Sequence, residues 1–434
     1  MSDRWLYGWG LASIGLGGAS LIVPLYVVSL GGGPAVLGVL AAVAAVAGAP
    51  GALVVGRLAD RTGHRRGYIL GAIGVVAAGL VGVAAVESIP LVIVANAAIW
   101  FAFAAATPVL TLLVVVDAPE SEWSDRIARL NEWQGVGWAL GLLVGFVVVL
   151  VGERVVGLAP VTVQRLVCLV CAVSTGVGGL VTASALPKER ESMPAPRRLQ
   201  RAITAATRFG VRGASFPFTP VRMDVRGFHP RRFVRRFTPG LALYFVAVTL
   251  AFAGFGAFFA PLPAYLGEAG FGSDAVFGLY FALNAGAAVF FGVAATLVAR
   301  YEVALVHVGS LAVRGVALPL VVVAGGSLAA AVPIFVVVGF TWAVIAVSAA
   351  TLVTRLAPPI VRGEALGVYS ALSAVAGGIG SVLGGWVAAT SYGYAFVLAG
   401  ALVFAGVAIV LVLRTRVGPD ARPEQTVYSA DATE

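Results

Sequence analysis

Charged residues are scarce in this chain of 434 residues. Asp, Glu, Lys and Arg together make up 11% of the sequence, whereas hydrophobic residues make up 60% and the mean hydropathy is +0.98. A soluble domain could not bury so much apolar surface, so a soluble fold is excluded. The apolar runs are each close to the roughly 20 residues that a membrane-spanning helix needs. This pattern predicts an all-α integral membrane protein with twelve transmembrane helices.

Residues that carry metal, redox or nucleotide chemistry are also few. The two cysteines, Cys168 and Cys171, lie in an apolar run, where we expect them to pack rather than to bind metal. The phosphate-binding pattern G-x-x-x-x-G-K-[ST] does not occur. We therefore expect no enzymatic activity, no cofactor and no metal site.

Basic residues are present, but they are unevenly placed. All 29 Lys and Arg except Arg154, Arg165 and Arg314 fall at the N-terminus, in every second loop or in the C-terminal tail. This alternation is typical of loops that face the cytoplasm, so we expect a multi-pass protein of the cell (plasma) membrane with both termini inside. The net charge of +9 then reflects membrane topology, and we expect no nucleic-acid partner.

One long polar segment divides the chain into two parts of similar size. We expect a six-helix bundle over residues 1–186, a cytoplasmic basic linker over 187–238, a second six-helix bundle over 239–413 and a cytoplasmic tail over 414–434. Within the linker, apolar and basic residues over 197–236 alternate as in a helix that lies on anionic lipid. Ordinary loop charge explains the same residues equally well.

Short segments of the first half recur in the second half. Ala35-Val36-Leu37-Gly38 recurs as Ala275-Val276-Phe277-Gly278. The glycines Gly137, Gly141 and Gly145 recur as Gly377, Ser381 and Gly385. The members of each pair are about 240 residues apart, so the two halves are predicted to be structural repeats.

A short basic bridge joins the second and third apolar runs. Residues 56–66 read G-x-x-x-D-R-x-G-x-R-R. This pattern closely resembles the loop between the second and third helices of the major facilitator superfamily, and the chain as a whole resembles its drug and metabolite efflux members. The resemblance implies two parallel six-helix repeats with a substrate site between them near the bilayer midplane.

The resemblance also implies a role for the bridge. Asp60 would cap or pair with a neighbouring helix, and the basic residues would engage Asp117 at the end of the fourth helix. Together they would form a gating latch that breaks when the halves move. Its residues would be Gly56, Asp60, Arg61, Gly63, Arg65, Arg66 and Asp117. The alternative is that this loop collects arginine as any cytoplasmic loop does.

The fourth expected helix carries a mixed polar and aromatic stripe. Its members are spaced three or four residues apart and therefore share one helix face: Asn96, Trp100, Phe103, Thr107 and Thr111. Such a face suits a cavity for amphiphilic molecules, although polar groups also hold membrane helices together. By resemblance, helices one, four, seven and ten line the cavity. We add residues from helices seven, eight and ten as further candidates: Phe252, Phe255, Phe259, Asn284 and Trp342.

None of the 20 Asp and Glu lies near the middle of an expected span. Proton coupling normally relies on an ionisable group inside the membrane, so His307 and Arg314 are the candidates. Arg314 lies about 18 Å along the ninth helix at ~1.5 Å per residue, past the middle of a hydrocarbon core that is ~30 Å thick. Such a position invites a functional explanation, while snorkelling or packing against helix-end carbonyls is the structural one.

Three functions remain open at this stage. Efflux of amphiphilic small molecules by alternating access is favoured by the aromatic stripe. Uptake or uniport of a small polar metabolite is the alternative, because proton-driven exporters of the family usually have an arginine where this chain has Asn96, and a Gly-Pro pair where it has Gly141-Leu142. A non-transporting membrane sensor or lipid-binding protein is a third possibility. We expect a monomer whose partners are a small-molecule substrate and membrane lipid.

Overall fold

A computed structural model of the chain describes residues 4–62, 64–115, 119, 122–186, 238–358 and 362–417. Within these ranges the chain forms twelve long helices and no strand. Eleven helices are long and apolar enough to cross a membrane, and the remaining long helix contributes the shorter apolar segment Pro34–Gly48. The prediction of an all-α membrane protein is therefore confirmed. The linker, including the predicted lipid-binding segment 197–236, lies outside the described residues.

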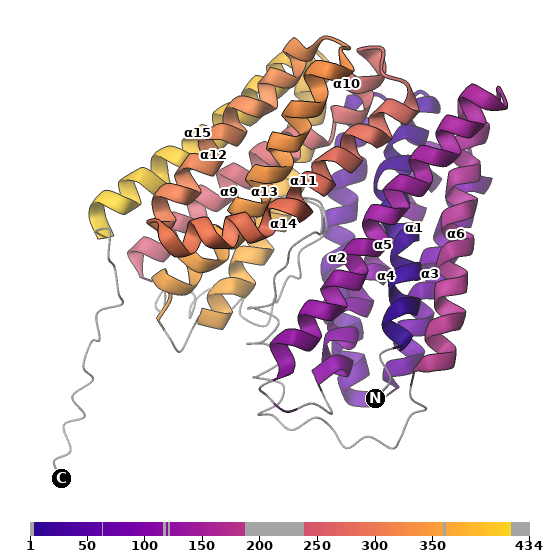
Figure 1. Cartoon of the computed structure of the whole chain (residues 1–434), viewed down its shortest axis with the longest axis horizontal. Coiled ribbons are helices and arrows are strands. Elements are labelled where there is room, and N and C mark those ends of the chain that lie inside the picture. Colours follow the sequence, from indigo (N-terminus) through magenta and orange to yellow (C-terminus); the bar gives the residue numbers. More distant parts are fainter. Residues whose placement is uncertain are drawn as a thin grey trace.

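The described helices form two sets, which Figure 1 shows side by side. The N-terminal half contains α1 (Arg4–Ser29), α2 (Pro34–Thr62), α3 (Arg65–Ala85), α4 (Ile89–Val115), α5 (Trp123–Val149) and α6 (Pro160–Ala185). The C-terminal half contains α9 (Pro239–Phe259), the short α10 (Leu262–Glu268), α11 (Ser273–Arg300), α12 (Val303–Leu320), α13 (Leu328–Leu356), α14 (Arg362–Ala388) and α15 (Tyr392–Val417). A π-helical turn, Leu150–Val155, extends α5, and a 3-10 turn, Val321–Ala324, extends α12.

Two ends of the molecule can be distinguished by the turns between the helices. At the end that we call the basic end, α2 and α3 meet at residues 62–65 and α11 and α12 meet at 301–302. At the opposite end, which we call the far end, α1 and α2 meet at 30–33 and α10 and α11 meet at 269–272. Gly31 (φ +87°) and Gly270 (φ +89°) adopt a left-handed backbone in these two far-end turns, which favours glycine.

Glycines bring the central helices of each half into close contact. A Cβ atom added at Gly137 of α5 would collide with the Gly10 carbonyl oxygen of α1. In the C-terminal half, a Cβ atom at Gly380 of α14 would collide with the Ala253 carbonyl oxygen of α9. Small residues allow membrane helices to approach closely and so gain van der Waals contact in place of a hydrophobic driving force. Both halves therefore use the same packing device.

The halves meet through equivalent surfaces at the far end. In one contact Gly145 of α5 packs against Phe277 of α11, and in the other Gly385 of α14 packs against α2 at Ala35 and Gly38. The sequence comparison had already paired Gly145 with Gly385 and segment 35–38 with segment 275–278. The repeated segments thus meet one another across a pseudo-twofold arrangement. An ion pair of 2.7 Å between Arg154 and Asp274 also joins the halves there.

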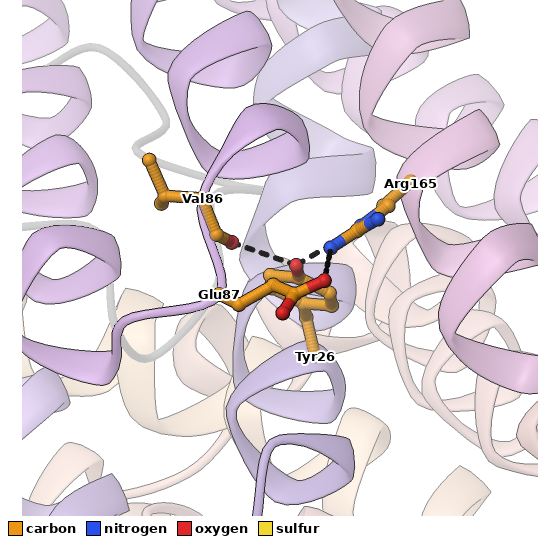
Figure 2. A network of polar contacts seen from close by, with 4 residues as sticks. All are labelled: Tyr26, Val86, Glu87 and Arg165. Carbon is orange, nitrogen blue, oxygen red and sulfur yellow. Dashed lines mark hydrogen bonds and ion pairs between the residues drawn. The ribbon is translucent and has the colours of Figure 1, made fainter.

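A network of hydrogen bonds and one ion pair connects helices at the far end of the N-terminal half (Figure 2). The buried Tyr26 hydroxyl of α1 donates a hydrogen bond of 2.7 Å to the Val86 carbonyl oxygen and accepts one of 3.2 Å from Arg165 Nε. Arg165 also pairs with Glu87 at 2.6 Å. The network joins α1, α6 and the turn between α3 and α4, and all of its members belong to one half.

Several helix boundaries differ from those expected. Helix α2 continues to Thr62 and α3 begins at Arg65, so most of the basic bridge is helical and the turn is short. The seventh span of the chain is divided at residues 260–261 into α9 and α10, next to Pro261, which lacks a backbone N–H to continue the helix. Helix α12 ends at Leu320, one residue after Pro319, and continues as the 3-10 turn.

Candidate substrate cavity

A cavity lies between the two halves and holds about 670 Å³ of empty space, part of which is open to the surroundings. Helices α1, α2, α4 and α5 form one wall, and α9, α10 and α11 form the other. The side chains of the first wall are Ala19, Ser20, Pro24, Leu37, Leu40, Ala41, Ala44, Asn96, Trp100 and Trp138. The second wall consists of Phe259, Ala260, Pro263 and Tyr280. Because residues from both halves enclose one space, a relative movement of the halves must change it.

Asn96 is the main polar side chain of the first wall. It is 4% exposed, and its amide makes no hydrogen bond to any described residue. Neither atom of the amide is among the fully buried polar atoms that lack a partner, so the amide reaches the open space of the cavity. The amide therefore presents a donor and an acceptor to whatever occupies the cavity.

Two indole rings, those of Trp100 and Trp138, lie in the same wall as Asn96. Trp100 lies 6.0 Å from Trp138 and 6.1 Å from Phe103, measured between ring centroids. Phe103 stacks on Trp9 at 6.1 Å, and both rings line a separate small cavity inside the N-terminal half. The wall thus offers wide apolar surfaces to an aromatic ligand, with one amide to orient it.

The structure divides the predicted stripe of α4 between two environments. Asn96 and Trp100 face the cavity between the halves, whereas Phe103 faces the small cavity behind it. The Thr107 hydroxyl donates to the Phe103 carbonyl oxygen at 2.8 Å, and the Thr111 hydroxyl donates to the Thr107 carbonyl oxygen at 2.9 Å. These two threonines bond within their own helix and do not line the cavity.

Of the cavity residues predicted in the second half, only one lines the cavity between the halves. Phe259 lines the cavity, and Phe252 lines a small internal pocket next to His307. Phe255 and Trp342 pack against Arg314. Asn284 donates to the Tyr280 carbonyl oxygen at 2.6 Å and does not reach the cavity, whose wall holds Tyr280 instead.

Trp138 and Tyr280 were absent from the predicted cavity. Trp138 directly follows Gly137, which packs on α1. Its place beside one of the repeated glycines of α5 was a usable sign that it faces the protein interior. The α2 face had a signal as well, since Leu37, Leu40, Ala41 and Ala44 recur at helical spacing. Tyr280 shares a face of α11 with the predicted Asn284, one turn further along, so the sequence indicated this face, and the structure places Tyr280 rather than Asn284 at the cavity.

His307 is held by two polar partners inside the C-terminal half. Its Nδ1 lies 2.8 Å from Ser348 Oγ, and its Nε2 lies 3.2 Å from the Tyr244 hydroxyl. The Ser348 hydroxyl donates to the Val344 carbonyl oxygen at 2.7 Å, so it accepts from the imidazole N–H. Nε2 then accepts from Tyr244. A neutral imidazole with both nitrogens paired accounts for its burial.

Arg314 is the other buried ionisable group. Its side chain is 0% exposed, so it does not snorkel to either end of the molecule. Nη1 donates to the Val338 carbonyl oxygen at 3.0 Å and lies 3.4 Å from Thr341 Oγ1, whereas Nε and Nη2 have no hydrogen-bond partner. The guanidinium carbon lies 4.4 Å from the ring centroid of Phe255.

Most residues of the predicted latch lie wholly or partly outside the part of the chain that the structure describes. Gly63 and Asp117 lie outside the described residues, as do the side chains of Asp60 and Arg61 and the surroundings of Gly56. Arg65 and Arg66 form the first turn of α3. Arg66 donates to the Ala183 carbonyl oxygen at 2.7 Å and to the Leu186 carbonyl oxygen at 3.4 Å. Its described partners are therefore at the end of α6.

Comparison with known proteins agrees with this architecture. A family model described as Major Facilitator Superfamily matches residues 8–381, and the chain belongs to this family of membrane transporters. No curated protein matches the chain.

Solved structures share the fold at low sequence identity. A variant of the nucleoside transporter NupG has a TM-score of 0.71 at 15% identity, covering 94% of this chain and 98% of its own. A bacterial homologue of the human lysosomal transporter Spinster has a TM-score of 0.71 at 14% identity, covering 96% and 97%. The xylose transporter XylE from E. coli has a TM-score of 0.66 at 14% identity, covering 96% and 98%.

Proposed function

We propose that this transporter exports amphiphilic aromatic small molecules through the cavity between its halves. The observation that carries the proposal is the cavity-facing amide of Asn96 beside the indole rings of Trp100 and Trp138. An amphiphile would place its apolar body against Trp100 and Trp138 and a polar group at the amide. A purely polar solute would leave most of this wall without favourable contacts.

The mechanism follows from the distribution of contacts between the halves. The glycine contacts and the Arg154–Asp274 ion pair join the halves at the far end. Breaking these contacts, while the halves close at the basic end, would present the cavity to the other side. A substrate favours one state only to the extent that it binds the two states unequally.

The placement of basic residues supports an orientation of the transporter in the membrane. If the basic end faces the cytoplasm, as the positive-inside pattern indicates, then the far end is the outer one. The state with a joined far end would load its substrate from inside. Protease accessibility of the 187–238 segment in sealed inside-out and right-side-out vesicles tests this orientation, and cleavage only in right-side-out vesicles would contradict it.

Two asparagine variants test the cavity. We expect Asn96→Leu to weaken binding of an aromatic amide such as naphthylacetamide about fivefold, since a neutral hydrogen bond contributes ~1 kcal/mol. Asn284→Leu is the matched control, because its amide bonds to its own helix outside the cavity. Equal binding by wild type and Asn96→Leu, or flux no faster than in empty liposomes, would contradict the proposal.

Uptake of a small polar metabolite is the second candidate. It is favoured by the neutral Asn96 in place of an arginine and by fold neighbours described as transporters of nucleosides and xylose. Counterflow of radiolabelled nucleosides and sugars in proteoliposomes distinguishes the two functions. Saturable counterflow of a nucleoside or sugar, without flux of naphthylacetamide, would favour uptake.

We also propose that the 56–66 bridge acts as a latch at the basic end. The proposal rests on the family pattern and on the contact of Arg66 with the end of α6, which already ties α3 to a neighbouring helix. Asp60→Asn would then lower flux and leave equilibrium binding of naphthylacetamide unchanged. Unchanged flux would show that the bridge needs no carboxylate at this position.

A further inference from the structure

Arg314 occupies an unusual place behind the C-terminal wall of the cavity. It projects from α12 into the space between α9 and α13, where it contacts Phe255 and Phe259 of α9 and Trp342 of α13. Its side chain is 0% exposed, and none of the described carboxylates forms an ion pair with it. An arginine remains protonated in such surroundings, so the positive charge needs compensation from elsewhere.

The protein supplies only part of this compensation. One carbonyl and one hydroxyl oxygen face Nη1, while Nε and Nη2 have no partner. The faces of aromatic rings attract a cation, but each such contact contributes less than an ion pair with a desolvated carboxylate. Nε and Nη2 lie on one edge of the planar guanidinium, which is the edge that binds a carboxylate with two parallel hydrogen bonds. The unsatisfied edge therefore has the geometry of an anion site.

One aromatic residue contacts both the substrate cavity and the guanidinium. Phe259 lines the cavity on one side, and its ring centroid lies 5.7 Å from the Arg314 guanidinium carbon on the other. Trp342 lies 5.6 Å from the same carbon, and its indole nitrogen also has no hydrogen-bond partner. Phe259 is therefore the side chain that would have to move for a ligand in the cavity to reach the guanidinium.

We infer that Arg314 binds the anionic group of a substrate whose apolar body occupies the cavity, so that the preferred cargo is an amphiphilic organic anion. This inference rests on the proposed transport function and specifies its substrate class. The carboxylate or sulfonate of such a molecule would displace the Phe259 ring and bond to Nε and Nη2. Trp100 and Trp138 would hold the apolar body from the other wall.

The test compares two ligands with the same ring system, anionic naphthylacetate and neutral naphthylacetamide. Equilibrium binding of both is measured on the purified full-length protein in lipid nanodiscs. We expect wild type to prefer the anion by about tenfold or more, because hydrogen bonds to a charged group contribute more than neutral ones. Arg314→Gln should remove this preference and retain amide binding, whereas Arg314→Lys should retain part of the preference.

Arg165→Gln is the matched control, since Arg165 is already paired with Glu87 and lies outside the cavity. It should leave the preference for the anion unchanged. If Arg314→Gln does not fold, Phe259→Ala provides a second test, because it should accelerate association of the anion more than that of the amide.

Equal affinities in wild type, or a preference that survives in Arg314→Gln, would overturn the anion inference and leave the cavity proposal intact. An equal acceleration of both ligands by Phe259→Ala would also overturn it. Failure of wild type to bind either ligand would refute the proposed amphiphile transport itself, and the anion site with it.

Discussion

The two walls of the cavity are built from similar rings but differ in charge. The N-terminal wall combines Trp100 and Trp138 with the neutral amide of Asn96. Behind the C-terminal wall, the rings of Phe255 and Phe259 cover the guanidinium of Arg314. The two halves are therefore repeats in architecture, with the same glycine packing, and differ in chemistry at the site that they enclose.

This difference indicates how a duplicated bundle acquires a polarised binding site. Helix packing requires small residues in both halves, and this requirement keeps the backbones alike. The residues in and behind the cavity walls are free of this requirement, so a charged side chain can lie behind one wall and not behind the other. A ligand bound between them would be oriented by this asymmetry.

The largest effect is expected where the halves are alike. Gly137→Leu and Gly380→Leu should each destabilise the protein by about 3 kcal/mol or prevent folding, because overpacked contacts cannot relax against a neighbouring backbone. Gly292→Leu is the control, since a Cβ atom there has no neighbour within 4 Å. Thermal unfolding in detergent measures the effect. Destabilisation by only one of the two substitutions would show that the halves do not depend on glycine packing to the same extent.

The next effect concerns the buried imidazole of the C-terminal half. Ser348→Ala leaves His307 Nδ1–H without an acceptor and should destabilise the protein by about 2 kcal/mol. Thr354→Ala should have little effect, because that hydroxyl bonds only to the Ala350 carbonyl oxygen of its own helix. Equal thermal unfolding curves for the two variants would show that the imidazole does not depend on Ser348.

Two arginines, one in each half, should respond in opposite directions. Arg314→Met replaces a buried, incompletely paired charge by an apolar side chain of similar length and should stabilise the protein by about 1 kcal/mol. Arg165→Met removes the hydrogen bond to Tyr26 and the ion pair with Glu87, and should destabilise it by up to about 1 kcal/mol. Chemical unfolding in mixed micelles provides the measurement. Destabilisation by Arg314→Met would identify this arginine as a structural element.

The smallest effect is expected at the ion pair between the halves. Arg154 is 64% exposed in its pair with Asp274, so Asp274→Asn should shift the conformational equilibrium by less than about 1 kcal/mol. The shift should increase thiol labelling of a cysteine at Ala41, a cavity position, from the far end. Glu87→Gln breaks an ion pair inside one half and should leave labelling unchanged. Equal labelling of both variants would exclude a gating role for the pair.

Much of the architecture could be predicted from the sequence. Hydropathy revealed the helices, and the pattern over residues 56–66 indicated the family. The recurrence of segment 35–38 as segment 275–278 anticipated the surfaces through which the halves meet at Gly385 and Gly145. These features are readable because spanning length, turn glycines and close helix contacts each demand particular residues.

The site was harder to predict, for a physical reason. In a membrane, the faces of a helix that meet lipid and the faces that meet protein are both apolar, so periodicity separates them poorly. On one face of α11, Asn284 was chosen for the cavity, but its amide bonds to its own helix and Tyr280, one turn earlier, lines the cavity. Arg314 was noticed because arginine is rare at such depth, but its direction depends on how α12 packs against α9 and α13.

The central claim is that the halves move as bodies around the cavity that they share. Spin labels test it in a variant with Cys168 and Cys171 replaced by alanine, with one pair at Val155 and Leu328 of the far end and another at Tyr7 and Tyr301 of the basic end. Electron–electron double resonance then measures both distances with and without naphthylacetate. We predict that the ligand changes the populations of the two pairs in opposite directions, one lengthening as the other shortens. Distributions that stay unchanged while the ligand is bound would contradict the account.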